Sequence, residues 1–113
     1  DDEKAARKKA IDEATRHAIM VPFSVMEISF SSFRILRAMT ETGNPNSVSD
    51  ACVGALAVRA CIRGAAMNVR INTASLEDKA FKDKMLAAAD EIEGKAELEE
   101  RHIIGIAMQK MGM

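Results

Sequence analysis

The chain has 113 residues, of which 48% are apolar and 29% are charged, with a formal net charge of −1. This length and apolar content predict one small domain with a packed core, and they exclude an intrinsically disordered chain. The small net charge argues against general binding to nucleic acid or to an anionic membrane surface. The absence of Trp and Tyr also removes the best side chains for stacking on bases.

Cys52 and Cys61 are the two cysteines, and both fall in one predicted helix. Nine residues of helix separate them by more than a disulfide can span, so we expect two reduced thiols. Reduced thiols are typical of a cytosolic protein, and no signal peptide is visible. We therefore expect a cytoplasmic protein. The first residue is Asp1 rather than Met, which suggests a fragment or a processed chain.

Two helices are predicted before Gly43, with a break at Pro22. Alanines at helical spacing indicate a first helix over residues 2–20. Pro22 disfavours the α conformation at the preceding residue, which predicts a stop there, and Pro22 itself suits the first turn of a second helix. That helix is expected over residues 22–42, where Gly43 is a natural C-terminal stop.

A third helix is predicted over residues 47–71, opened by a capping box of Ser47 and Asp50. Nearly its whole circumference is apolar, which is typical of a helix surrounded by other helices or by lipid. Its charged residues, Arg59 and Arg63 among them, make a lipid environment costly, so we predict a central helix and no membrane span. A fourth helix is expected from residues 75–78 to about residue 111.

The predicted fold class is all-α, a bundle of long helices around a central apolar helix. A helix that is apolar on every side needs roughly four neighbours, and this chain offers three. The uncovered surface would exceed what soluble monomers expose. We therefore expect the bundle to be completed by a missing N-terminal segment of the same protein, by a second subunit, or by both.

Two sequence blocks resemble a known family. They are GNPNSVSDA at residues 43–51 and GAAMNVRIN at residues 64–72, preceded by Val21-Pro22 and followed by DKAF at residues 78–81. In this order and spacing they are similar to the formiminotransferase-cyclodeaminase/methenyltetrahydrofolate cyclohydrolase family, over residues 18 to about 97.

This resemblance implies a helical dimer with a folate site between helices near the subunit interface. It also implies that residues 1–113 are the C-terminal part of a single helical domain, without the glycine- and alanine-rich segment with which family members begin. The implied reaction converts 5-formimidoyltetrahydrofolate to 5,10-methenyltetrahydrofolate with release of ammonia, and the cyclohydrolase reaction is the alternative. The tetrahydrofolate derivative is the substrate, and no cofactor is expected. A non-catalytic helical oligomerisation module is the alternative from another class.

The turn before the third helix is the first candidate site. Polar side chains and free amides at a helix start form an electropositive cradle, although Gly, Asn, Pro and Ser also simply make a turn and a cap. With the resemblance, we expect Ser47 to cap the helix, and Asn44 and Asn46 to face the ligand. Asp50 is the candidate catalytic residue, in an orienting or cation-stabilising role, with capping as the alternative.

The third helix carries further candidates. A buried Arg needs an anion, so Arg59 and Arg63 should meet either acidic residues of the last helix or the carboxylates of a folate tail. Asn68 and Asn72 are four residues apart, and either could line a cleft or close the helix end. We expect Asn68 to contact the substrate and Asn72 to end the helix.

Two pairs have the spacing of metal ligands: Glu13 with His17, and Glu99 with His102. A di-metal bundle needs carboxylates that point inward from four helices. Both pairs lie in highly charged stretches, where exposure is expected. We therefore predict no metal site.

Overall fold

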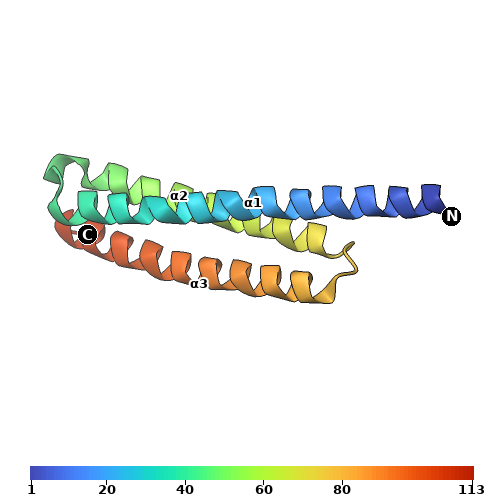
Figure 1. The fold of residues 1–113 in the computed structure, drawn as a ribbon. Coiled ribbons are helices and arrows are strands. Elements are labelled where there is room, and N and C mark those ends of the chain that lie inside the picture. The colour runs from blue at the N-terminus through green and yellow to red at the C-terminus, as the bar shows by residue number, and fades with distance from the viewer.

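The computed structural model describes all 113 residues as three long α-helices and one short 3-10 turn (Figure 1). The elements are α1 (Asp2–Thr42), η1 (Pro45–Ser47), α2 (Val48–Thr73) and α3 (Lys79–Lys110). Helix α2 runs antiparallel to α1 and α3, in an elongated bundle of 68 × 18 × 16 Å. The all-α prediction is therefore confirmed, with one helix fewer than expected.

The predicted break at Pro22 is wrong, because α1 passes through this residue without interruption. A proline inside a helix has no N–H for the carbonyl four residues earlier, which here is that of Ala18. Asn72 of α2 takes the place of the missing donor, since its Nδ2 lies 3.1 Å from the Ala18 oxygen. This side-chain hydrogen bond satisfies the carbonyl and allows the helix to continue.

On each helix, a buried residue recurs every seven positions. This series comprises Ile19, Met26, Phe33 and Thr40 on α1; Val48, Ala55, Ile62 and Val69 on α2; and Ala89, Ala96 and Ile103 on α3. Ala51, Ala66 and Ala107 are also buried, outside the series. A seven-residue apolar repeat is typical of a left-handed, coiled-coil-like bundle. The frequent alanines in this core let the helix axes approach closely.

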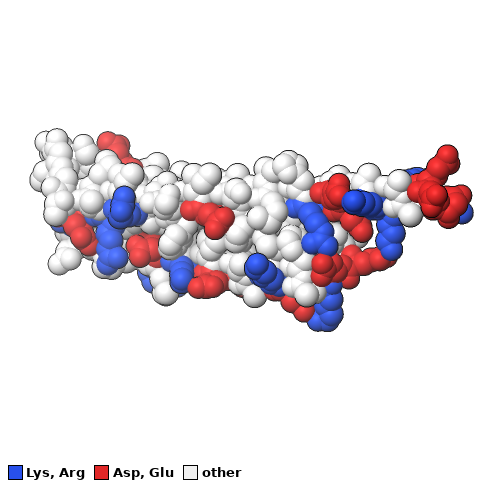
Figure 2. Space-filling view, viewed as in Figure 1, with Lys and Arg blue, Asp and Glu red and all other residues white.

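Helix α2 is the central helix of the chain, as predicted, because it packs extensively against both α1 and α3. Its outer side is nevertheless exposed, at Val53, Leu56, Met67 and Ile71. The space-filling view shows a long uncharged stretch over α1 and α2, whereas charged side chains gather along α3 and at the N-terminal end (Figure 2). The chain alone does not cover its central helix.

Two segments, α1 and Pro45–Thr73, contain 18-residue windows long and apolar enough to cross a membrane, by length and composition. Core helices of soluble proteins pass the same test. The absence of a membrane span therefore stays a prediction, based on the charged residues of these helices.

The connection from α1 to α2 requires glycine at position 43. The Gly43 N–H donates to the Met39 oxygen at 3.0 Å, and a Cβ at Gly43 would overlap that oxygen. The predicted capping box is wrong: Ser47 precedes α2, but its side chain makes no capping hydrogen bond. The 3-10 turn leads straight into α2, and its own cap is Asn44, which accepts from the Asn46 N–H at 3.0 Å.

Helix α3 begins at Lys79, later than the predicted start at residues 75–78. Its N-cap is Asp78, whose Oδ1 accepts from the Phe81 N–H at 3.1 Å. The Ser75 Oγ instead donates to the backbone oxygen of Asn72 at 3.2 Å, in the turn that follows α2.

Candidate functional site

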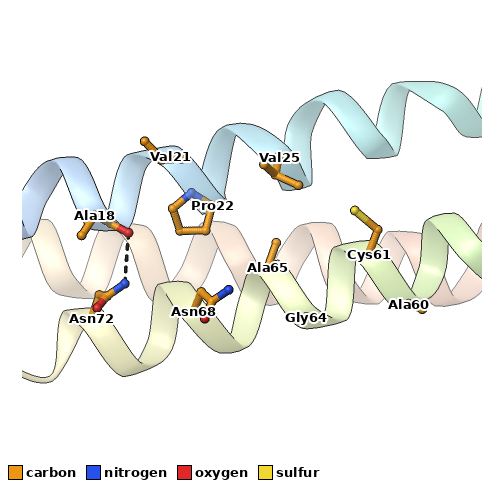
Figure 3. Close-up of a pocket in the computed structure, with 10 residues that line it drawn as sticks. All are labelled: Ala18, Val21, Pro22, Val25, Ala60, Cys61, Gly64, Ala65, Asn68 and Asn72. Atoms are coloured by element: carbon orange, nitrogen blue, oxygen red, sulfur yellow. Dashed lines mark hydrogen bonds between the residues drawn. The ribbon is translucent and has the colours of Figure 1, made fainter.

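A groove of about 710 Å³ lies between α1 and α2 (Figure 3). Its ten lining residues are Ala18, Val21, Pro22 and Val25 of α1, and Ala60, Cys61, Gly64, Ala65, Asn68 and Asn72 of α2. Small residues create the space: nothing lies within 4 Å of where a Cβ on Gly64 would be. None of the lining residues is charged, so the groove suits a neutral, largely apolar ligand surface.

Polar groups mark the two ends of this groove. At one end, Asn68 and Asn72 project from successive turns of α2 (Figure 3). Asn72 is bonded to the Ala18 oxygen, whereas Asn68 is exposed and its side chain makes no hydrogen bond within the chain. At the other end, the Cys61 Sγ lies 3.3 Å from the Ser29 Oγ. Convergent amides in an apolar groove are what a site needs to orient a small molecule.

The structure places Asn68 in this groove, as one of its lining residues. Asn72, which was expected to end the helix, also lines the groove. Asn72 does not end α2, which continues to Thr73. The i, i+4 spacing of Asn68 and Asn72 predicted that the two amides lie on the same side of the helix. The pairing of Asn72 with Ala18 was not predictable, because it depends on the packing of α1 against α2.

The predicted turn residues lie far from the groove. Asn44, Asn46, Ser47 and Asp50 are at the opposite end of α2, with the Asp50 side chain exposed and without a hydrogen bond in the chain. Eighteen residues of helix separate Asp50 from Asn68, which is roughly 27 Å. Within one chain, these residues and the groove do not form one compact site.

Arg59 faces α3, and not the groove. Its guanidinium lies 3.5 Å from a Glu100 oxygen and 3.9 Å from a Glu97 oxygen, with 15% of the side chain exposed. The acidic residues of the last helix, one of the two anions predicted for this residue, thus lie beside it, although its buried Nη1 has no partner. Arg63 is exposed and makes no ion pair.

Arg70 makes a second link of the same kind between α2 and α3. Its Nη2 lies 2.7 Å from Asp90 and 3.1 Å from Glu93. The hydrogen bonds that Arg70 donates to Glu93 and Asp90 raise the pKa of Arg70 above its already high ordinary value, so the charge is permanent. Arginines on one side of the central helix are therefore structural ties to α3.

A polar cluster that the sequence did not predict joins the ends of α1 and α3. Arg37 contacts Glu41 at 3.2 Å, Glu99 at 3.5 Å and the His102 Nε2 at 2.9 Å. The hydrogen bonds from Arg37 and His102 hold the pKa of Glu41 below its ordinary value. The predicted pair Glu99 and His102 thus lies in an ion-pair cluster, and no group of three or more metal-ligating side chains is gathered in the structure.

Comparisons with known proteins match most of the chain to one family. The formiminotransferase-cyclodeaminase family model matches residues 1–91, which include every residue of the groove. A methenyltetrahydrofolate cyclohydrolase of Methylorubrum extorquens is 38% identical over 94 residues, covering 83% of this chain and 44% of that protein.

Two formimidoyltransferase-cyclodeaminases are also similar. That of Dictyostelium discoideum is 38% identical over 86 residues, which cover 76% of this chain and 16% of the relative. That of Rattus norvegicus is 32% identical over 83 residues, which cover 74% of this chain and 15% of the relative. The chain thus spans less than half the length of these curated relatives. By its sequence and its helical structure, the chain belongs to the formiminotransferase-cyclodeaminase family.

Proposed function

We propose that the chain forms part of an enzyme that converts 5-formimidoyltetrahydrofolate to 5,10-methenyltetrahydrofolate. The α1–α2 groove supports this proposal, since it lies wholly in the region that matches the family and offers an uncharged cleft with two amides at one end. In the reaction, N10 of the folate attacks the formimidoyl carbon held at N5. N10 then loses its proton, and the protonated amine leaves as ammonia.

The groove suits this chemistry because the reaction is intramolecular. Binding the folate rings between two rigid helices would hold N10 near the one-carbon unit, and such orientation lowers the barrier by removing rotational freedom. The leaving amine also needs a proton donor. Cys61, at the other end of the groove, is the only lining residue with an ionisable group. We therefore propose that the remaining polar groups of the site come from outside the groove.

We propose that a second copy of the chain supplies this missing part. Exposed apolar residues on α1 and α2 form what we call the α1–α2 apolar face: Val21, Val25, Ile28, Ile35, Met39, Val53, Leu56, Met67 and Ile71. On α1 these residues follow spacings of three and four, with Ser32 completing the series between Ile28 and Ile35. This is the pattern of a second helix-packing stripe.

An antiparallel second copy would also bring the predicted turn residues back to the groove. Helix α2 spans residues 48–73, so if a two-fold axis passed through its middle, residue 50 of one copy would lie level with residue 71 of the other. Asp50 of the partner subunit would then lie beside the Asn68–Asn72 end. This arrangement would give Asp50 its predicted orienting or cation-stabilising role.

The cyclohydrolase reaction is the second candidate, in which water attacks the carbon that bridges N5 and N10. The Methylorubrum extorquens protein favours it, since that relative matches a larger share of this chain than the cyclodeaminases do. Both reactions need the same orientation of the folate. They differ in the nucleophile: in the cyclohydrolase reaction water must reach the bridging carbon, and in the cyclodeaminase reaction N10 attacks the formimidoyl carbon.

The test is to supply the two substrates separately to the purified protein. A cyclodeaminase releases ammonia from 5-formimidoyltetrahydrofolate as the absorbance of the methenyl product rises. A cyclohydrolase instead accelerates the loss of that absorbance when 5,10-methenyltetrahydrofolate is given in water. If neither rate exceeds the background and 5-formyltetrahydrofolate does not raise the melting temperature, the chain is a non-catalytic oligomerisation module.

A further inference from the structure

Pro22 and Asn72 act on the same backbone carbonyl, that of Ala18. Pro22 removes the backbone donor for the Ala18 carbonyl, and the Asn72 Nδ2 replaces it at 3.1 Å (dashed line in Figure 3). The two ends of an amide side chain look alike, but only the nitrogen can donate to a carbonyl. The hydrogen bond therefore fixes the direction of the whole Asn72 amide.

Because the nitrogen of Asn72 is held on Ala18, its Oδ1 is an acceptor with a fixed position. No donor in the chain bonds to this oxygen, and it is not among the buried unpaired atoms. Asn68, one turn earlier on α2, has an exposed amide with no hydrogen bond, which is free to turn. At this end of the groove, the Asn72 oxygen is therefore an acceptor in a fixed direction, and the Asn68 amide beside it can turn to donate or to accept.

These two amides restrict the chemistry of the ligand edge that they can meet. A carboxylate is disfavoured, because the Asn72 oxygen repels it and the lining holds no cation. A neutral ring edge with adjacent N–H groups and a carbonyl is complementary: the N–H groups donate to the fixed oxygen, and the carbonyl accepts from the second amide. The apolar remainder of the groove, from Val25 to Ala60, suits the flat faces of such a ring.

We propose that Asn72, oriented by Pro22, is a specificity-determining residue that accepts hydrogen bonds from the aminopyrimidinone edge of the pterin ring, with Asn68 donating to the ring carbonyl. This inference rests on the proposed function, and it adds which part of the folate lies at this end of the groove. The glutamate tail consequently extends away from the amides, out of the uncharged groove.

The experiment must separate recognition by Asn72 from its support of α1. Pro22→Ala restores the backbone donor to Ala18, so in that background Asn72→Leu no longer leaves the carbonyl unpaired. The wild type, Pro22→Ala and Pro22→Ala/Asn72→Leu proteins are compared by calorimetric titration with 5-formyltetrahydrofolate and with its 4-amino-4-deoxy analogue. This analogue turns the ring carbonyl into a donor and the neighbouring ring N–H into an acceptor.

We expect Pro22→Ala, in which Asn72 is no longer held in one direction, to bind 5-formyltetrahydrofolate about threefold to fivefold more weakly than the wild type. The double variant should bind it at least about tenfold more weakly than Pro22→Ala. The wild type should also prefer the 4-oxo compound to the 4-amino analogue, and the double variant should lose most of this preference. Equal affinity of the single and double variants, or an unchanged preference in the double variant, overturns the inference alone. If the wild type binds neither compound, the proposed function fails as well.

Discussion

Asp78 combines two tasks at the start of α3. Its Oδ1 caps the helix through the Phe81 N–H, and its Oδ2 accepts from the Arg16 Nη2 at 2.8 Å. The Arg16 guanidinium also lies 4.7 Å from the centre of the Phe81 ring. The hydrogen bond from Arg16, followed by that from the Phe81 amide, lowers the pKa of Asp78 below its ordinary value. One carboxylate thus ties α1 to the first turn of α3.

Replacing this carboxylate should lower the stability of the protein in a pH-dependent way. We expect Asp78→Ala to reduce the melting temperature by roughly 2–5 °C at pH 7. Because the pKa is depressed in the folded state, the stabilisation is present above the ordinary carboxyl pKa and is lost as the pH falls through the folded value. The difference between variant and wild type should therefore shrink below about pH 4. Circular dichroism melts from pH 7 to pH 3 measure it.

Asp83→Ala is the matched control for this prediction. Asp83 pairs with Lys79 on the exposed side of α3 and caps nothing, so its loss should have little effect at any pH. A difference between Asp78→Ala and the wild type that stays constant down to pH 3 would contradict the role of the carboxylate charge.

The structural roles of Pro22 and Asn72 could not be predicted from their neighbours in the sequence. Pro22 predicted a helix end, and the prediction failed because a side chain 50 positions later in the sequence supplies the missing hydrogen bond. Asn68 was expected to contact the substrate and Asn72 to end the helix, whereas both line the groove. Which of them would be bonded to the other helix depends on tertiary packing, and no local pattern carries that information.

At the scale of helices, α1 and α3 are joined at their C-terminal ends by a shared cap. The last turn of α1 contains no basic residue to balance the negative end of its dipole. Lys110 of α3 supplies that charge, since its Nζ lies 2.7 Å from the carbonyl oxygens of Thr40 and Glu41. The end of α3 thus satisfies the carbonyls that α1 leaves unpaired.

We expect Lys110→Met to destabilise the protein by about 0.5–1 kcal/mol, because it keeps the aliphatic stem and removes only the charged donor. Urea unfolding measures the loss, and hydrogen exchange should show faster opening at the last turn of α1. Lys95→Met is the control, since Lys95 pairs only with Glu91 on the surface of α3. Equal losses for both variants would show that Lys110 is no more than a surface charge.

The apolar pattern of α1 predicted the helix but not which side faces inward. Val25, Ile28, Phe33, Leu36 and Met39 look like one apolar side in the sequence. In the structure Phe33 is buried and Leu36 is half-buried, whereas Val25, Ile28 and Met39 are exposed. The helix carries two apolar stripes, one for its own bundle and one on the α1–α2 apolar face. Periodicity alone cannot separate two stripes that adjoin.

The buried stripe gives the larger energetic prediction. Phe33→Ala removes a ring that is 1% exposed and packs edge to face on Phe30, with ring centres 5.7 Å apart. We expect a loss of about 3–5 kcal/mol in the free energy of unfolding, measured by urea titration. Ile35→Ala, on the outer stripe, is the comparison and should cost far less in dilute solution. Similar losses for the two variants would mean that the inner and outer stripes have been misassigned.

At the scale of the whole molecule, the charge distribution divides the bundle into two sides. Helix α3 is tied to α2 by Arg59 and Arg70 and carries charged side chains along its length, while the α1–α2 apolar face is uncharged (Figure 2). Exposed apolar surface of this extent is typical of an interface. The length of the chain and its apolar third segment predicted that a partner is needed. The side proposed here for the partner could be inferred only once α3 was placed.

The last prediction tests this face directly. Ile28 is 70% exposed at the middle of the α1 stripe, and a second copy packed there would bury it. Ile28→Glu should therefore shift the protein to monomers at tens of micromolar, because a carboxylate in an apolar interface loses its hydration without a partner. Leu98→Glu is the control: Leu98 is 63% exposed on α3, outside the face, and its replacement should leave the assembly intact. Sedimentation velocity distinguishes these outcomes. A wild-type protein that remains monomeric at such concentrations, with Ile28→Glu unchanged from it, would remove the second copy from the proposed site, and with it the part given to Asp50 of the partner subunit.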